Sequence, residues 1–223
     1  MDQAGALLNS GKGFPWMGHR VESFNPPSIP DTEHVSAYNF GPTILPGKPP
    51  FTVDDLFGFP DDGNRYELCD GSLLVSPPHT VRHQVALKNA LFILDDAATH
   101  DLAALMQVNF RASDTDCYIP DLVVMPRNAA FSTELMISPH DILLIGEIVG
   151  HTTSKQDKGL KPVAHAEAGI PTYWRIEPDE GPTLYVYQLH GDVYGPPTAY
   201  QAGTTAKLTA PFPVSFDPAQ FLD

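Results

Sequence analysis

The chain has 223 residues, a net charge of −14 and a pI near 4.8, which argues against a protein whose whole surface follows a phosphate backbone. Hydrophobic residues make up 42% and charged residues 18%, as in an ordinary globular protein. The sequence shows no secretory leader and no apolar run of about 18 residues, which predicts a cytoplasmic protein without a membrane span.

The first 50 residues differ in composition from the rest of the chain. They combine many prolines with Gly, Ser and Asn, and they show no sustained period of 2 or 3.6. We therefore predict a disordered or loosely docked extension over residues 1–50 and one domain over residues 51–223. Cys69 and Cys117 are expected to be reduced thiols, and no metal-binding cysteine pattern occurs.

From residue 51 onward the pattern is that of a folded domain. Thr52 is a candidate N-cap for a short helix over residues 53–58. Two short strands flank Asp70-Gly71, which is a strong hairpin signal and makes Asp70 a turn residue. After Pro78 an apolar stripe at helical spacing predicts a helix of about 20 residues.

The second half of the domain alternates predicted strands with a predicted helix. Strands are expected over residues 102–111, 118–125 and 141–149, and the last two are apolar enough to lie at the centre of a sheet. A helix or kinked helix follows over residues 153–169 and ends at Gly169. Three further strands are expected within residues 172–177, 183–189 and 192–200. This order predicts an α/β domain with a mixed β-sheet flanked by helices.

Two acidic residues lie on the predicted central strands. Asp121 opens one strand and Glu147 lies near the far end of the next, inside the apolar run LLIGEIV. If these strands are neighbours, the two carboxylates repel each other unless a proton or a cation lies between them, and oxygen ligands of this kind suit Mg²⁺ or Mn²⁺. Lys161, in the following segment, could balance their charge. The simpler alternative is that each acid faces water at a strand end.

Several motifs occur together in the order and spacing of a known family. These are RYELCDGSLLVSPP with RHQ, YIPDLVV, LLIGEIV and DKGLKPVAHAEAGIPTYWRIEPDEG. Over about residues 51–222 the chain resembles the Uma-two family of restriction-endonuclease-like proteins, in the PD-(D/E)xK nuclease superfamily. The resemblance implies a restriction-endonuclease-like core and a metal-dependent nuclease.

The resemblance also assigns roles to individual residues. It makes Asp121 and Glu147 the metal ligands, with Mg²⁺ or Mn²⁺ as the cofactor, and it matches Glu67 and His83 to the family's early glutamate and first-helix histidine. Val149 occupies the usual position of the superfamily's lysine, so Lys161 is the matching lysine. The chain departs from the family pattern at Gly150-His151-Thr152 and at His165, which replaces a tyrosine.

Each assignment has an alternative. Glu67 could form a cross-strand ion pair with Arg65 or Lys161, and His83 could be a hydrogen-bonded core histidine. Pro162 could either aim Lys161 at the sheet or simply begin a new helical turn. The histidines His140, His151 and His165 lack zinc-site spacing.

The leading functional hypothesis is a Mg²⁺-dependent endonuclease that hydrolyses DNA phosphodiester bonds. The charge of −14 opposes it. The alternative is a non-catalytic nuclease-fold module for binding or regulation that keeps the site residues, with a homodimer through its aromatic strands as one arrangement. A hydrolase of small phosphoesters fits the acidic surface but has no motif behind it.

Overall fold

The computed structural model describes residues 46–76, 79–150, 156–179 and 181–223. The predicted extension over residues 1–50 therefore lies almost wholly outside the described residues, and the domain boundary stays a prediction. No helix in the described ranges has the length and apolar character needed to cross a membrane.

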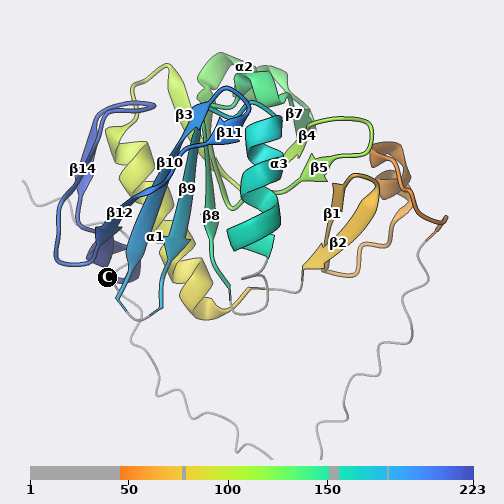
Figure 1. The fold of residues 1–223 in the computed structure, drawn as a ribbon. Helices are drawn as coiled ribbons and strands as arrows, with labels where there is room; N and C mark the ends of the chain where they lie inside the picture. The colour runs from red at the N-terminus through yellow and green to blue at the C-terminus, as the bar shows by residue number, and fades with distance from the viewer. Residues whose placement is uncertain (1–45, 77–78, 151–155, 180) are drawn as a thin grey trace, which may run out of the picture. The chain divides into compact units, whose positions relative to one another are not determined.

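A mixed seven-stranded sheet forms the centre of the domain (Figure 1). Its strands β8 and β9 run parallel and are joined by a crossover that contains α3 (Lys161–Glu167), whereas its other strand pairs are antiparallel. In spatial order the strands are β11 (Val193–Tyr194), β10 (Thr183–His190), β9 (Thr172–Glu177), β8 (Leu144–Ile148), β6 (Leu122–Pro126) and β3 (Leu102–Met106), with β12 (Thr198–Gln201) also paired to β10.

One face of this central sheet is covered by a long helix and by the C-terminal part of the chain. The helix α1 (Val81–Ala97) packs there through the predicted stripe of Leu87, Ala90, Leu91 and Leu94, of which Leu91 is only partly buried, and through Ala86. The hairpin of β13 (Ala206–Leu208) and β14 (Val214–Phe216) and the 3₁₀ helix η4 (Pro218–Leu222) pack on the same cluster. The strands β6 and β8 are buried on both faces, as their apolar sequences predict.

The opposite face carries α3 and a second sheet. The strand order of that sheet is β2 (Ser72–Ser76), β1 (Arg65–Cys69), β5 (Cys117–Tyr118), β4 (Asn109–Arg111) and β7 (Met136–Ile137). The hairpin between β1 and β2 turns at Asp70 and Gly71, which have φ angles of 48° and 67°. These left-handed angles explain why an Asp-Gly pair stands there, and they confirm Asp70 as a turn residue.

Several predicted elements are confirmed and others are divided. The predicted helix over residues 53–58 is the 3₁₀ helix η1 (Val53–Gly58), and Thr52 donates its backbone N–H and its hydroxyl to the Asp55 carboxylate at its start. The expected strand over residues 102–111 was wrong as one element, because Gln107 has a φ of 54° and the chain passes there from β3 to β4 in the other sheet. The expected strands over residues 118–125 and 192–200 are also each divided between two strands.

Some short elements were not predicted from the sequence. They are the helix α2 (Arg127–Ser132), the 3₁₀ helices η2 (Pro139–Asp141) and η4, and the strands β7, β13 and β14. The helix or kinked helix expected over residues 153–169 is the π-helical turn η3 (Gln156–Leu160) followed by α3. Both cysteines are free thiols, as expected.

Candidate active site

The pairing of β6 with β8 places Asp121 beside Glu147. Leu122 lies opposite Gly146 in this antiparallel pair, so the next positions, Asp121 and Glu147, face each other on the same side of the sheet. Gly146 lets the two strands approach, since a Cβ there would lie 3.1 Å from the Cβ of Leu122. Both carboxylates are only 2% exposed. The two strands are therefore neighbours, which is the condition under which the sequence places the two carboxylates close together.

The two carboxylates line a small, polar pocket at the end of the central sheet. The pocket has a volume of about 10 Å³, on the order of the space that one water molecule needs. Its walls are Arg65, Glu67, Ser76, His79, Asp121, Glu147, Ile148 and Lys161.

Asp121 is surrounded by hydrogen-bond donors. Its Oδ2 lies 3.0 Å from His83 Nε2 and accepts a 2.9 Å bond from the backbone N–H of Ile148. Its Oδ1 lies 3.4 Å from an Arg65 guanidinium nitrogen. Burial alone would raise the pKa of Asp121, but the His83 hydrogen bond and charge, the Ile148 amide and the Arg65 charge together lower it to about 2. Asp121 is therefore a carboxylate at neutral pH.

Glu147 has fewer donors and more acidic neighbours. Its Oε1 accepts a 3.1 Å hydrogen bond from Lys161 Nζ and lies 3.4 Å from His165 Nε2. Burial raises the pKa of Glu147 to about 7; the Lys161 ammonium opposes this rise, while the carboxylates of Asp121 and Glu67 add to it. Without a further cation, Glu147 is therefore partly protonated at neutral pH.

Lys161 joins Glu147 to Glu67. Its Nζ lies 3.4 Å from Glu67 Oε1, which also accepts a 2.8 Å hydrogen bond from the backbone N–H of Ile119. The helix α3 begins at Lys161, with Pro162 in its first turn, directly after the π-helical turn η3. Pro162 therefore lies in the first turn of a new helix, as one interpretation expected, and the side chain of Lys161 at the start of this helix lines the pocket.

The structure brings together all five residues that the sequence singled out, Glu67, His83, Asp121, Glu147 and Lys161, and all are buried. Glu67 pairs with Lys161, as one alternative expected, whereas Arg65 pairs with Asp121. His83 is buried and hydrogen-bonded to Asp121, so it both packs in the core and contacts the site. The catalytic roles of the five stay predictions.

Sequence reasoning missed two neighbours of Asp121. Arg65 Nη1 lies 2.5 Å from His79 Nε2, and the imidazoles of His79 and His83 stack with their centroids 3.8 Å apart. Burial lowers the pKa of His79 to about 4, so its ring is neutral and can accept from Arg65. The spacing of His79 and His83, four residues apart at a helix start, was the signal available in the sequence.

Comparison with known proteins identifies the family. A family model described as "Uma2: Putative restriction endonuclease" matches residues 53–220. The chain belongs to the Uma2 family. No curated protein matches it.

A crystal structure with a similar fold comes from Anabaena variabilis and is described as a putative nuclease belonging to DUF820. The similarity covers 72% of this chain and 89% of that chain, with a TM-score of 0.58 and 16% sequence identity. At this identity the likeness concerns the fold, and the predicted nuclease-like α/β fold is confirmed.

The pocket of this Uma2 protein offers ligands suited to a hard divalent cation. Asp121 and Glu147 contribute carboxylate oxygens, the atoms that Mg²⁺ and Mn²⁺ prefer. Three buried carboxylates, Glu67, Asp121 and Glu147, outnumber the two permanent cations Arg65 and Lys161. Burial raises the pKa of Glu147, and the neighbouring carboxylates add to this rise, which a bound cation would oppose. The residues therefore fit the metal that the family resemblance implies.

A second group of potential ligands shares Asp121. Among the described residues, His79, His83 and Asp121 each place a ligand atom within 4.8 Å of the others. However, the two imidazole planes differ by only 4° and lie one above the other, so no single point is in the plane of both rings. Arg65 also lies against His79. This group does not suit a metal ion in the arrangement seen, and the carboxylate set is the better candidate.

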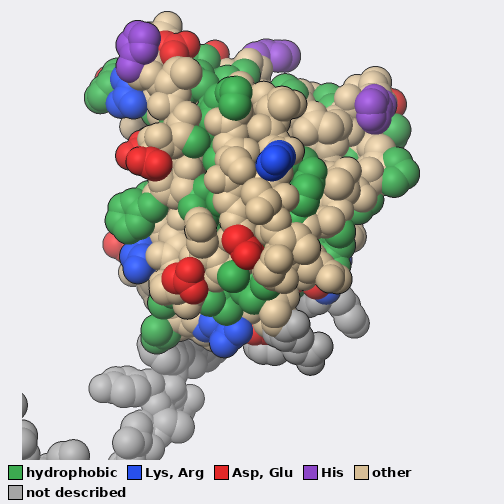
Figure 2. Space-filling view, turned by 90° about the vertical axis from the view of Figure 1, so that its left-hand side faces the viewer, with side chains coloured by type: hydrophobic (Ala, Val, Ile, Leu, Met, Phe, Trp, Pro, Cys, Tyr) green, Lys and Arg blue, Asp and Glu red, His purple; other side chains and the backbone are tan. Residues whose placement is uncertain are grey.

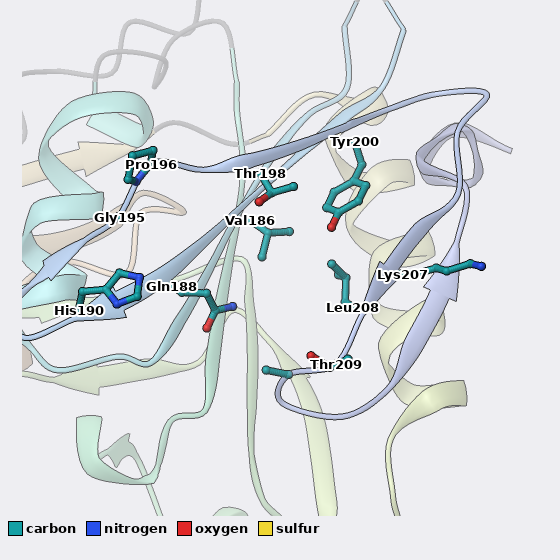
Figure 3. A pocket seen from close by; sticks show the side chains of 11 residues that line it. Val186, Gln188, His190, Gly195, Pro196, Thr198, Tyr200, Lys207, Leu208 and Thr209 are labelled. Atoms are coloured by element: carbon teal, nitrogen blue, oxygen red, sulfur yellow. The ribbon is translucent and has the colours of Figure 1, made fainter.

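A much larger cavity lies away from the carboxylates. It has a volume of about 420 Å³ and lies between β10, β12 and the segment after β13 (Figure 3). Its lining includes Gln188, His190, Thr198, Tyr200 and Lys207 but no carboxylate. Because it lacks acidic oxygen ligands, this cavity offers no site for the metal, and the small pocket remains the candidate active site.

Proposed function

We propose that this Uma2 protein is a metal-dependent endonuclease that hydrolyses DNA phosphodiester bonds. The observation that carries the proposal is the convergence of Asp121, Glu147 and Lys161 in one buried pocket at the end of the central sheet. Family membership supports the same reaction class.

In this proposal Asp121 and Glu147 hold Mg²⁺ or Mn²⁺. The ion would supply a bound water of lowered pKa and positive charge for the phosphate oxygens. Asp121 is prepared for this role, because His83 and the Ile148 amide hold it in the charged form. The carboxylate of Glu147 has two oxygens, so it could hold the ion and still accept the hydrogen bond from Lys161.

Lys161 is the proposed source of positive charge for the reaction. Lys161 is 5% exposed, and its ammonium group lies between Glu147 and Glu67 at the pocket wall. There it can orient a water or face the negative charge that develops on the phosphate. Glu67 keeps the ammonium in place and is itself fixed by the Ile119 amide.

The acidic surface limits where DNA can bind. Figure 2 shows the face that carries β12 and the β13–β14 hairpin, and its Lys and Arg side chains are scattered among acidic and uncharged ones. Basic side chains occur near the pocket instead, at Arg65, Lys158 and Arg175. We therefore infer that DNA approaches the pocket side of the sheet, at a local basic strip.

A nuclease assay tests the proposal. Purified full-length protein is incubated with plasmid and linear DNA in Mg²⁺, in Mn²⁺ and with a chelator, beside Asp121→Ala and a surface control, Lys207→Gln. We expect metal-dependent cleavage that the control retains and that Asp121→Ala lowers by a factor on the order of 100 or more. Equal cleavage by wild type and Asp121→Ala would refute the proposed site.

The second candidate function is a non-catalytic nuclease-fold module. The observation that favours it is the small volume of the pocket, with Lys161 already bonded to Glu147. A protein that binds DNA or metal but cleaves nothing in Mg²⁺ or Mn²⁺ would favour this module over the nuclease.

A further inference from the structure

A row of polar side chains crosses the central sheet from the candidate site. Glu147 lies beside Arg175 in the parallel pair of β8 and β9, and Arg175 lies beside Tyr185 in the antiparallel pair of β9 and β10. Residues in register on neighbouring strands share a face of the sheet. The neighbours of Arg175 along β9, Trp174 and Ile176, point to the opposite face, where α1 packs. Arg175 therefore faces the same side as Glu147, one strand away.

The Arg175 side chain is held in one orientation. Its guanidinium carbon lies 4.3 Å above the centroid of the Tyr185 ring. Its Nη1 donates a 2.5 Å hydrogen bond to the Tyr187 hydroxyl, and its Nε lies 3.0 Å from Glu177. In the part of the chain that the structure describes, Nη2 makes no hydrogen bond or ion pair. The arginine is thus fixed through Nε and Nη1, which lie on different edges of the guanidinium group, and Nη2 is the donor left over.

The charges around Arg175 favour an anion. Glu177 is shared between Arg175 and Lys158, whose Nζ lies 3.0 Å from the second oxygen of that carboxylate. Two cations on one carboxylate leave a local excess of positive charge in a chain whose net charge is −14. Lys158 is 43% exposed, and Arg175 is 13% exposed. An approaching phosphate could reach both groups.

Arg175 lies one strand away from the candidate site. Neighbouring β-strands lie about 4.8 Å apart, so a phosphate bound at Arg175 would lie beside one bound at the pocket. The remaining Nη2 group donates in the plane of a guanidinium group that is already held in place, which a flexible lysine ammonium does not reproduce.

We propose that Arg175, assisted by Lys158, binds the phosphate next to the scissile phosphate of a DNA strand that crosses the sheet along this row. The proposal rests on the proposed nuclease function and adds to it a residue that positions the substrate. Tyr185 and Tyr187 keep the guanidinium group oriented, and Glu177 keeps the two cations together.

DNA binding measured at several salt concentrations tests this proposal. Labelled duplex DNA of 16 base pairs and its single strand are titrated with full-length protein in the Glu147→Gln background, which prevents turnover under the proposed mechanism. The variants compared are Arg175→Gln, Arg175→Lys and Lys207→Gln. The last removes one charge from β13, on the α1 side of the sheet.

We expect Arg175→Gln to raise Kd for the duplex about tenfold and to reduce the slope of log K against log salt by about 0.9. Arg175→Lys should keep the slope and lose part of the affinity, because it keeps the charge without the planar, oriented guanidinium group. Lys207→Gln should leave both unchanged. A purely structural ion pair would change the melting temperature but not the salt slope.

Equal Kd and equal slope for Arg175→Gln and Lys207→Gln would overturn the proposal. If Arg175→Gln does not fold, Arg175→Lys decides, and affinity equal to that of the parent would overturn it as well. The two proposals fail separately. A wild-type protein that cleaves nothing refutes the nuclease, whereas cleavage together with an unchanged salt slope refutes only the role of Arg175.

Discussion

The two halves of the pocket, one around Asp121 and one around Glu147, bury their carboxylates equally but shift the pKa values of these carboxylates in opposite directions. Both residues are 2% exposed and lie opposite each other on paired strands. The pKa of Asp121 falls to about 2 and that of Glu147 rises to about 7. Burial acts in the same direction on both, so the difference comes from the neighbours: an imidazole, an amide and a guanidinium on one side, and two further carboxylates on the other.

The opposite pKa shifts suggest different roles for the two carboxylates in metal binding. One permanently charged carboxylate can attract a cation, while the other exchanges a proton for it. A pocket with two strongly paired carboxylates would gain little from a metal, and a pocket with two unpaired ones would be unstable without it. The asymmetry therefore suits a protein that folds in the absence of metal and binds metal afterwards.

The largest effect is expected from removing the cation on the Glu147 side. Lys161→Met keeps the volume but leaves the buried carboxylates Glu147 and Glu67 without their shared partner. We expect a loss of about 3–5 kcal/mol in the free energy of unfolding, measured by urea denaturation at pH 8.

The control for Lys161→Met is Lys158→Met, because Lys158 also pairs with a glutamate but is 43% exposed. This control should cost less than about 1 kcal/mol. Similar losses in both variants would mean that the Glu147 side gains no special stability from its ammonium group.

The next largest effect is expected in the pH dependence of the free energy of unfolding. The pKa of Glu147 is raised from an ordinary 4.5 to about 7, so its contribution to stability is fully present below pH 4.5 and is lost as the pH rises through 7. Relative to Glu147→Gln, metal-free wild type should therefore lose stability between pH 4.5 and 7, by up to about 1.4 kcal/mol per pH unit.

The other groups that face Glu147 are Lys161, His165, Asp121 and Glu67, and they are present in both proteins. Burial lowers the pKa of His165 to about 3, so its contribution changes in the opposite sense and largely cancels in the difference. Parallel stability curves for wild type and Glu147→Gln over this range would contradict the raised pKa.

How far the sequence could predict this pocket depends on where each residue lies. Asp121 and Glu147 lie on buried strands whose apolar patterns predict central positions, and their approach then requires only that the two strands are neighbours. Arg65 lies on β1 in the second sheet, and its contact with Asp121 depends on how the two sheets pack. No periodicity specifies that packing, and for this reason the contact of Arg65 with Asp121 was missed, whereas His83 was expected from the family resemblance.

The division of the predicted strand over residues 102–111 has a similar cause. Its apolar pattern is continuous, but Gln107 adopts a φ of 54°, a conformation that glutamine rarely favours. Gln107 donates its backbone N–H to the carbonyl of Asp121, 3.1 Å away, so a contact distant in sequence stabilises the break. Tertiary structure overrides local propensity at this point.

A smaller loss of stability is expected when the charge of Asp121 is removed. Asp121→Asn removes the charge that His83 and Arg65 face and weakens the hydrogen bond from the Ile148 amide. We expect metal-free protein to lose about 1–3 kcal/mol at pH 8, whereas Glu147→Gln should be as stable as wild type or more stable. The comparison uses urea denaturation in a chelator. Equal losses in the free energy of unfolding for Asp121→Asn and Glu147→Gln would contradict the inferred difference between the two carboxylates.

The smallest expected effect is a rise in Tm on addition of metal, and it tests whether the different pKa values of Asp121 and Glu147 serve metal binding. If Mg²⁺ or Mn²⁺ binds between Asp121 and Glu147, it stabilises the wild type by about 1.4 kcal/mol at ten times Kd, seen as a rise in Tm. Glu147→Gln keeps the shape of the side chain but removes a charged ligand, so its Tm should not respond to the metal. The rise for wild type should be larger at pH 8 than at pH 5.5, because Mg²⁺ competes with the proton on Glu147. Equal responses of wild type and Glu147→Gln would place any bound metal elsewhere, and the buried glutamate of LLIGEIV would then be only a partner of Lys161.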